Sequence, residues 1–493
     1  MTSASHSQAH LEQLGRRDFF GRMSSGVPAI ALASLLARDE VALGKESHEA
    51  VPNHEDLSER SPHFPGKAKA VIQLFMNGGP SQMDLFDPKS ELDRLHGKPG
   101  PARIKADLSS PHNARGLLRS PFKFAKHGES GQDISDVLPH LHKHADDIAI
   151  IRSMKAKHFN HEPALYLIHS GKTQPGLPTI GAWSVYALGT VNQNLPAYVV
   201  LDDPNGLPVN GTQSWQPGYL PPIFQGTRLR ATGTPILNLR PSKEIPDGVV
   251  EAERALLRKF DRRHLNQRPL EKELSARMAS YELAARMQLS ATDALDLSQE
   301  SEKTREEYGL NAKDDMASYG RRCLMARRLV ERGVRYVQIF IEGQIWDSHS
   351  TLEKGLRRAA RKTDQPVSAL LTDLKRRGLW DDVLVVWNGE FGRLPVAELA
   401  KGADISMAGR DHGPSAFSLW MAGAGIKGGT VYGATDEIGH RSVENVVSVH
   451  DFHATVLHLL GLNHRDVFYT QPTQRRDRLT DEFPTRVVKE ILV

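Results

Sequence analysis

Short, continuously apolar runs that alternate with helical patterns are the feature that most constrains the fold of this chain. The runs AVIQLFM, IAIIRSM, AYVVL, RYVQIFI, VLVVW and FSLWMAG occupy residues 70–76, 148–154, 197–201, 335–341, 383–387 and 417–423. Apolarity without alternation is typical of strands that are covered on both faces. Helical patterns lie between the runs, notably at 316–333 and 366–378. This order predicts an α/β fold with a mostly parallel central sheet and helices on both faces.

The division into domains follows from the same pattern. The 493 residues contain no internal repeat and no second strand-rich block, so we expect one large domain at 67–493. A charged, helical stretch at about 249–317 predicts a lobe packed over one edge of the sheet. Residues 41–66 are polar and contain several histidines, which indicates a linker. The single cysteine, Cys323, excludes an internal disulfide and is expected to be a buried thiol.

The N-terminus has the pattern of an export signal. Arg16 and Arg17 precede Phe19 and Phe20 and the apolar run VPAIALASLLA at 27–37. A twin-arginine pair ahead of a short apolar run is the layout of a bacterial Tat signal, so we assign this role to residues 1–40. The alternative, an amphipathic helix with solvated arginines, is disfavoured because the run is apolar all round. The run is shorter than the ~20 residues needed to span a bilayer. We therefore expect an exported protein, periplasmic or extracellular, without a stable membrane span.

The charge of the chain excludes one class of partner. The formal net charge is +4 over 493 residues, and no stripe of lysine and arginine stands out. Nucleic acid is therefore not the expected partner.

Two pairs of polar residues follow predicted strands. In IWDSHS, Asp347 and His349 are two residues apart, so in an extended segment both side chains project to the same side. A carboxylate with an imidazole is half of a common zinc or manganese site, although an Asp–His hydrogen bond on a loop is an equally common arrangement. In NGEFGR, glycines flank Glu390 and would let the backbone approach a ligand, and Arg393 could hold an oxyanion. The alternative there is a glycine turn with a solvated Glu–Arg pair.

A third pair, Asp411 and His412 in GRDHGP, comes just before the last strand. His412 is a candidate metal ligand, and Asp411 is a candidate for orienting its imidazole. Because ligands bind at the carboxyl ends of the strands in such sheets, all three pairs are expected at one edge.

Further candidates lie earlier and later in the chain. Asn77 ends the first strand and Asp84 follows seven residues later. In KAKHFNHEPALYLIHSG, His158 and His161 crowd a loop that opens a helix; a solvated loop is the favoured interpretation for His158. His161 is expected at the N-terminus of that helix, where free N–H groups attract anions. His450 precedes a helical run and is a weaker candidate.

Taken together, these stretches resemble the alkaline phosphatase superfamily, above all its sulfatase branch. The resemblance is closest to an uncharacterised, Tat-exported, sulfatase-like family of planctomycetes and their relatives. It is carried in order by GRRDFF, FMNGGPSQMDLFDPK, IRSMKAKHFNHEPALYLIHSG, IWDSHS, WNGEFGR, GRDHGPSAFSLWMAGAGIKGG and VHDFHATVLHLLGL, which cover most of 67–462. The resemblance implies an alkaline phosphatase/sulfatase-like fold and a divalent metal centre.

The resemblance also implies roles for individual residues. His161 falls where sulfatases carry the cysteine that becomes formylglycine, Glu390 where a metal aspartate lies, and Asn77 where an aspartate ends the first strand. Asp347 and His349 match the Asp and His turn of the phosphoglycerate-mutase branch, and His412 matches a later histidine turn. Leu165 replaces the motif's arginine, and no Cys, Ser or Thr occupies the nucleophile position. A formylglycine mechanism is therefore excluded.

These observations predict an exported, metal-dependent hydrolase that acts on a sulfate or phosphate ester of a small molecule or glycan. Zinc or manganese is favoured and calcium is an alternative, as one or two ions. Asp347, His349 and His412 are expected to hold one cation, and Glu390 and Asn77, with His161 or Asp84, a second. Arg393 is expected to neutralise charge on the ester, and His161 could be a ligand, a general acid or a nucleophile. The alternative is a non-catalytic, exported binding protein that retains the fold.

Overall fold

The computed structural model describes residue 54 and residues 56–230, 247–268, 272–480 and 484–493. The predicted signal segment 1–40 and residues 41–53 and 55 of the predicted linker lie outside the described residues. Within the described ranges, no helix is both long enough and apolar enough to cross a bilayer.

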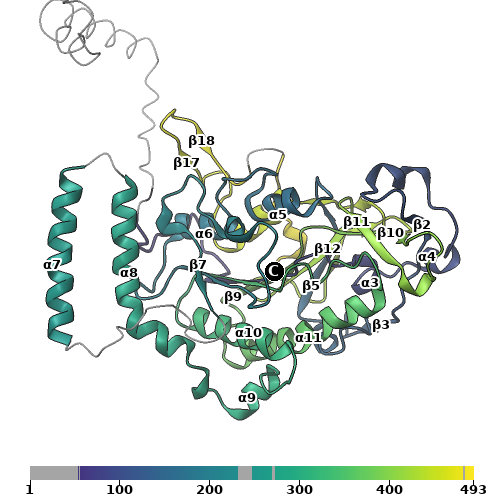
Figure 1. Cartoon of the computed structure of the whole chain (residues 1–493), viewed down its shortest axis with the longest axis horizontal. Coiled ribbons are helices and arrows are strands. Elements are labelled where there is room, and N and C mark those ends of the chain that lie inside the picture. Colours follow the sequence, from purple (N-terminus) through teal and green to yellow (C-terminus); the bar gives the residue numbers. More distant parts are fainter. Residues whose placement is uncertain (1–53, 55, 231–246, 269–271, 481–483) are drawn as a thin grey trace, which may run out of the picture. The chain divides into compact units, whose positions relative to one another are not determined.

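The largest sheet in the described part of the chain has nine strands, and all six predicted runs contribute to it (Figure 1). In spatial order they are β13 (Val431–Tyr432), β5 (Ile148–Lys155), β12 (Phe417–Ala422), β9 (Val383–Asn388), β1 (Ala70–Phe75), β8 (Tyr336–Phe340), β6 (Tyr198–Leu201) and β7 (Thr227–Leu229), with β16 (Val447–Ser448) paired to β5. All neighbours are parallel except that β12 runs antiparallel to both β5 and β9. The mostly parallel α/β sheet is therefore confirmed.

The direction of β12 decides what lies at the functional edge of the sheet. Because β12 is reversed, its first residue lies at the edge where β1, β5, β8 and β9 end. Residues that precede β12 and residues that follow the parallel strands therefore meet there.

The central strands are buried along their whole length, as continuous apolarity requires. Every residue of β1 is buried, and it pairs with β8 through Val71 and Tyr336 and with β9 through Ala70 and Val383. The one polar side chain in β1, Gln73, donates to Asn388 Oδ1 at 3.1 Å. Its amide oxygen accepts from the Tyr336 hydroxyl at 2.8 Å, so burial leaves both ends of the amide bonded.

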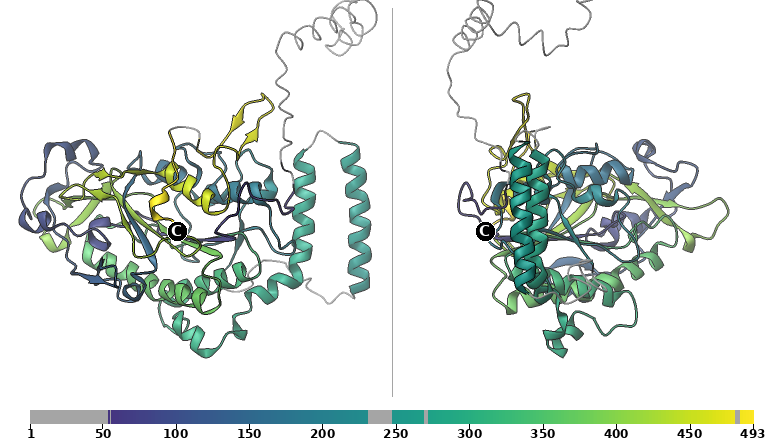
Figure 2. Two further views of the ribbon diagram at one scale, coloured as in Figure 1. Left: turned by 180° about the vertical axis from the view of Figure 1, so that it is seen from behind. Right: turned by 60° about the vertical axis from the view of Figure 1, so that its left-hand side comes forward.

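Helices cover both faces of the sheet (Figures 1 and 2). On one side lie α5 (His161–Ser170) and α6 (Ile180–Leu188), and on the other α10 (Met316–Glu331) and α11 (Leu352–Arg376). The remaining described α-helices are α3 (Gln82–Leu85), α4 (Ser90–Arg94), α7 (Asp247–Asn266), α8 (Lys272–Leu295), α9 (Glu302–Glu307) and α12 (Val449–Leu459). Short 3-10 helices occupy Ala102–Asp107, Leu141–His144, Gly211–Trp215, Pro222–Phe224, Leu297–Gln299, Ile405–Met407 and Lys489–Ile491. The described residues of the predicted stretch 249–317 are mostly helical, in α7, α8 and α9, and α8 packs against α10.

One helix starts earlier than the sequence pattern predicts. The prediction began at Pro366, but α11 begins at Leu352 and carries Pro366 in its interior. The helix buries a stripe that includes Leu356 on one side of the proline and Leu370 and Leu374 on the other. Burying that continuous stripe outweighs the hydrogen bond that the proline removes.

A smaller three-stranded sheet stands beside the main one. Its antiparallel strands are β11 (Gly409–Gly413), β10 (Gly392–Glu398) and β2 (Ala114–Leu117), over a small apolar cluster that includes Leu117, Leu394 and Val396. Two-stranded pairs are β3 (Phe124–His127) with β4 (Gln132–Ser135), β14 (Ala434–Thr435) with β15 (Ser442–Glu444) and β17 (Tyr469–Thr470) with β18 (Arg476–Asp477). Arg393, for which a glycine turn was the alternative, lies in β10, and His412, which the resemblance matched to a histidine turn, lies in β11.

Candidate metal centre

The candidate centre lies at the edge where the parallel strands end. The loop 342–350 follows β8 and carries Asp347 and His349, while Glu390 follows β9. His161 is the first residue of α5, which follows β5, as expected. The carboxyl ends of parallel strands share one edge, so these side chains are brought together from distant parts of the chain.

The carboxylate of Asp347 is the point on which the other side chains converge. Its Oδ1 lies 2.7 Å from Arg393 Nη1, 3.0 Å from His349 Nε2 and 3.4 Å from His412 Nε2. Its Oδ2 lies 3.3 Å from His161 Nε2. Burial alone would raise the pKa of Asp347, but the positive charge of Arg393 and the three imidazoles outweigh it and hold the pKa well below its ordinary value. The carboxylate is therefore ionised.

His161 is oriented by Glu390. The His161 Nδ1 lies 2.7 Å from Glu390 Oε1, and the same carboxylate accepts from the backbone N–H of Gly78 at 2.9 Å. When Nδ1 carries the proton and donates a hydrogen bond to Glu390, the lone pair of Nε2 faces Asp347. Burial would lower the pKa of His161, but the two carboxylates outweigh burial and raise it. A proton or a metal cation is therefore favoured between Nε2 and Asp347.

His349 and His412 form a second imidazole pair. Their Nε2 atoms are 2.9 Å apart, and His349 Nδ1 lies 2.5 Å from Glu398 Oε2. Hydrogen bonds to Asp347 and Glu398 raise the pKa of His349 to about 9, whereas burial lowers that of His412. Glu398 thus orients His349 as Glu390 orients His161, and it was not predicted because no glycine or histidine stands beside it and the sequence pattern predicted no strand ending there.

Strand pairing and glycine explain why these residues meet. In the β10–β11 ladder, Arg393 and His412 are register partners. The backbone at Gly409 passes so close to the loop 342–350 that a Cβ there would lie 2.0 Å from the carbonyl carbon of His349. Gly78, at φ +108, leaves room in the same way for the backbone nitrogen of Asp347, 2.5 Å from where a Cβ would stand.

Arg393 acts on Asp347 from a fixed position. The residue is 1% exposed, and its guanidinium donates to the carbonyl oxygens of Gly78, Gly79 and Arg410. Together with the pair to Asp347, these bonds use most of its five N–H groups. Its positive charge is therefore built into the centre, and little of the guanidinium remains to bind an ester directly.

The donor atoms of this cluster suit a divalent cation. Asp347 Oδ1, His349 Nε2 and His412 Nε2 are 2.9, 3.0 and 3.4 Å apart. Ligands at 2.0–2.1 Å from a tetrahedral zinc ion are separated by about 3.3 Å. Asp347 Oδ1 and His161 Nε2 are buried, and the short contacts given above are too poorly aligned to satisfy either atom fully among the described residues. His161, Asp347 and His412 can offer their ligand atoms within 4.8 Å of one another, as can His349, Glu398 and Asp411.

Asn77 and Asp411 border the cluster. Asn77 Nδ2 donates to Ile341 O at 2.5 Å, and its Oδ1 is buried without a hydrogen bond to any described residue. That oxygen is available to a ligand. The Asp411 carboxylate accepts from the backbone of Ser109, Ser110 and His412, at 2.8–2.9 Å, and from the Ser109 hydroxyl. Asp411 therefore holds the loop that contains Ser109 and Ser110 beside β11.

Three other candidates bond elsewhere. Asp84 forms a fully buried ion pair with Arg410, at 2.7 and 3.0 Å. His450 Nε2 lies 2.7 Å from Gly171 O. His158 Nδ1 accepts from Asn160 N at 3.0 Å on the loop before α5. None of the three belongs to the ligand groups found among the described residues.

Comparison with solved structures finds distant similarity. A protein in the alkaline phosphatase superfamily from Vibrio parahaemolyticus is 8% identical, with a TM-score of 0.37 over 88% of this chain and 77% of its own. The phosphonate monoester hydrolase SpPMH from Silicibacter pomeroyi is 12% identical, with a TM-score of 0.34 over 72% and 71%. The lipoteichoic acid synthase LtaP from Listeria monocytogenes is 10% identical, with a TM-score of 0.33 over 83% and 76%. Scores this low assign no activity to the chain.

Sequence comparison identifies the family. No curated protein matches the chain. A family model described as "Protein of unknown function (DUF1501)" matches residues 68–492, and the chain therefore belongs to the DUF1501 family.

Proposed function

We propose that this protein is an exported, metal-dependent hydrolase of sulfate or phosphate esters. The observation that carries the proposal is the convergence of three imidazole Nε2 atoms, from His161, His349 and His412, on the ionised carboxylate of Asp347. Imidazole with carboxylate is the ligand set that zinc and manganese accept, and the measured spacing suits such an ion. The motif resemblance to the sulfatase branch supports the ester substrate.

The protein's own residues would prepare the site for the cation. Asp347, His349 and His412 would hold one ion, with His161 on the other oxygen of Asp347. Glu390 and Glu398 fix which nitrogen of His161 and His349 carries the proton, which leaves each Nε2 free to bind. A divalent ion there would supply a Lewis acid and lower the pKa of a bound water to about 7.

The side chains around the centre limit the choice of nucleophile. Cys323 is fully buried in α10, and burial raises the pKa of its thiol to about 12, so it is not a nucleophile. Among the described residues, His161 is the histidine of the centre that is not assigned to the first ion, and its Nε2 could attack an ester. Water activated in the centre is the other nucleophile, and the proposal favours it because His161 Nε2 has the position of a ligand.

The test is metal analysis followed by a substrate panel. Protein purified without chelator should contain zinc or manganese, and it should hydrolyse at least one aryl phosphate or sulfate. Chelation should abolish turnover and re-addition of metal should restore it. His349→Ala should lose both metal and activity, whereas His158→Ala, a histidine outside the cluster, should retain both. If metal-loaded protein hydrolyses no ester in a broad panel, a non-catalytic binding protein becomes the better description.

Export is part of the proposal and has its own test. Arg16 and Arg17 precede an apolar run, which is the layout that the Tat machinery accepts. In a Tat-competent bacterium the full chain should reach the periplasm, and Arg16→Lys with Arg17→Lys should keep it in the cytoplasm. Arg22→Lys is the matched control and should not change its location. Periplasmic accumulation of the double variant at the level of the unaltered chain would contradict Tat export.

A further inference from the structure

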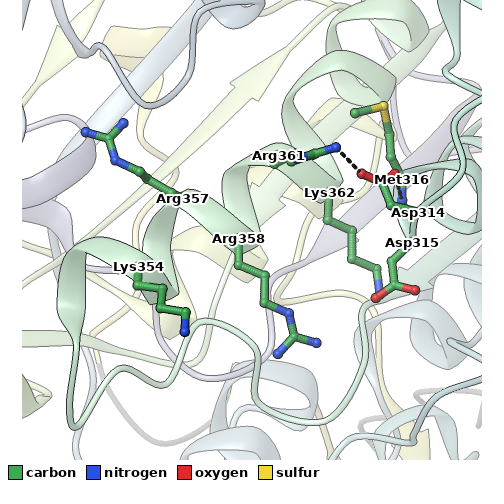
Figure 3. A pocket seen from close by; sticks show the side chains of 8 residues that line it. All are labelled: Asp314, Asp315, Met316, Lys354, Arg357, Arg358, Arg361 and Lys362. Atoms are coloured by element: carbon green, nitrogen blue, oxygen red, sulfur yellow. Dashed lines mark hydrogen bonds and ion pairs between the residues drawn. The ribbon is translucent and has the colours of Figure 1, made fainter.

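A basic pocket lies beside the loop that carries Asp347 and His349. It has a volume of about 570 Å³ and is formed by the N-terminal half of α11 and by residues 314–316 at the start of α10 (Figure 3). Five of its eight lining residues are lysine or arginine and two are aspartate, so the lining carries a net charge of +3. A pocket of this size accommodates a small-molecule ligand, and its charge favours an anion.

The cations of this pocket form a row. Lys354, Arg358 and Lys362 are four residues apart on α11, so they lie on one face of the helix, about 6 Å from one to the next. Figure 3 shows their side chains pointing to the same side, while Arg357 points away. Like charges at this spacing repel each other, so the row needs compensating negative charge.

The carboxylates of the protein compensate the row only in part. Arg358 Nη2 lies 2.6 Å from Glu342, and Lys362 Nζ lies 3.0 Å from Asp203 and 3.4 Å from the same Glu342. Asp203 is already paired with the buried Arg322 at 2.6 Å. Arg322, Arg358 and Lys362 therefore share the two carboxylates of Asp203 and Glu342.

The ammonium groups of Lys354 and Lys362 have N–H donors that the described residues of the protein do not use. Lys362 is only 3% exposed, yet its Nζ makes no hydrogen bond of good geometry to any described residue. Lys354 is exposed, and the described part of the chain places no carboxylate within ion-pair distance of it. A buried ammonium with unused donors is costly, and an anion in the pocket would relieve that cost.

The pocket is joined to the candidate centre through one loop. Glu342, which pairs with two cations of the row, begins the loop 342–350 that carries Asp347 and His349. The same loop packs directly on the first turn of α11, where a Cβ at Gly355 would lie 2.7 Å from Ser348 Oγ. A ligand in the centre would thus contact one end of this loop, and an anion in the pocket would contact the cations that pair with Glu342 at its other end.

We propose that this pocket binds a sulfate or phosphate group that the substrate carries in addition to the scissile ester. Lys354, Arg358 and Lys362 span about 12 Å along the helix, enough for a multiply charged saccharide-sized ligand. The assignment of the anion to the substrate rests on the proposed function, whereas the pocket's affinity for anions does not.

The experiment measures binding and turnover separately. Binding of sucrose octasulfate and of inorganic sulfate to the chelator-treated full chain is measured by calorimetry. Lys354→Gln with Arg358→Gln should weaken octasulfate binding roughly three- to tenfold and reduce its salt dependence. The matched control is Lys303→Gln with Arg305→Gln on α9, which removes the same two charges outside the pocket. Unchanged affinity in the pocket variant, or equal loss in the control, would overturn the site.

Turnover then distinguishes a substrate group from a free anion. For an ester that carries further sulfate or phosphate groups, the pocket variant should raise KM and leave kcat unchanged, and KM for a singly charged aryl ester should not change. If the pocket variant loses octasulfate affinity but has the same KM as the unaltered chain for the multiply charged ester, the pocket binds a free anion and the substrate assignment is wrong. If no ester is turned over, the binding measurement still decides the site, so the two proposals fail independently.

Discussion

At the scale of single residues, His161 poses the sharpest chemical question. The motif resemblance matches it to the residue that becomes formylglycine in sulfatases, yet an imidazole cannot become an aldehyde. Its Nδ1 is bonded to Glu390 and its Nε2 faces Asp347 at 3.3 Å. That arrangement is shared by a metal ligand and by a nucleophile, since both need a free lone pair on Nε2.

Substitution of His161 separates the two roles. We expect His161→Ala to bind the metal more than about 100-fold more weakly, because it removes a direct ligand, whereas loss of an orienting partner alone costs about 10- to 100-fold. Glu390→Gln should reduce the metal affinity less, since it removes only the hydrogen bond that orients the His161 ring. Metal titration with a chelator of known affinity measures both. Full metal affinity in His161→Ala combined with loss of turnover would instead identify His161 as the nucleophile.

The residues that sequence reasoning could and could not find differ in their surroundings. Asp347, His349 and His412 stand beside strand ends or glycines, where the pattern itself points to a site. Glu398 lies within LPVAELA and has no such neighbour; only the path of β10 brings it within 2.5 Å of His349. Asp84 looked like a ligand by position, but its partner, Arg410, comes from β11, and no spacing in the sequence reveals that pair.

At the scale of elements, the strands could be predicted and their directions could not. Continuous apolarity indicates burial on both faces, and each of the six runs predicted from it is a strand. Nothing in FSLWMAG shows that β12 runs against its neighbours. The reversal matters because it places Gly409–Gly413, which precedes β12, at the same edge as the loop after β8. These segments therefore meet at one edge, joined by a small sheet that no pattern in the sequence predicted.

The small sheet also explains how the centre is held without a covalent link. Arg393 and His412 face each other across β10 and β11, and Gln82 from α3 bonds both the N–H and the C=O of Arg393, each at 2.9 Å. Backbone hydrogen bonds thus fix two residues of the centre before any metal binds. This preorganisation lowers the cost of gathering ligands that are far apart in the sequence.

At the scale of the whole molecule, the core below the centre contains buried polar groups that join strands and helices. Tyr198 donates to Gln338 at 2.5 Å, and Gln338 Nε2 lies 3.3 Å from His169 Nδ1. His453 Nε2 lies 2.8 Å from Ile168 O. Burial lowers the pKa of His169 and of His453 to about 3, so both imidazoles are neutral in the folded protein.

These two histidines predict how stability depends on pH. In the unfolded chain each has a pKa near 6.5, so between pH 6.5 and 3 the unfolded state binds protons that the folded state does not. Stability is therefore fully present above pH 6.5 and is lost progressively as pH falls toward 3. At pH 5 each buried histidine should lower the free energy of unfolding by about 2 kcal/mol relative to pH 7.5, since one pKa unit corresponds to 1.36 kcal/mol.

Replacing one of them should reduce that dependence. Gln at position 453 can keep a donor toward Ile168 O but takes up no proton, so His453→Gln should reduce the loss of unfolding free energy between pH 7.5 and 5 by about 2 kcal/mol. Denaturation midpoints at several pH values measure the decline, and the comparison is of slopes because the substitution also changes packing. The exposed His112→Gln serves as control and should follow the unaltered chain. If stability falls with pH as steeply in His453→Gln as in the control, then His453 is protonated in the folded state. A hydrogen-bond acceptor beside the buried ring would then have to accept from the added N–H.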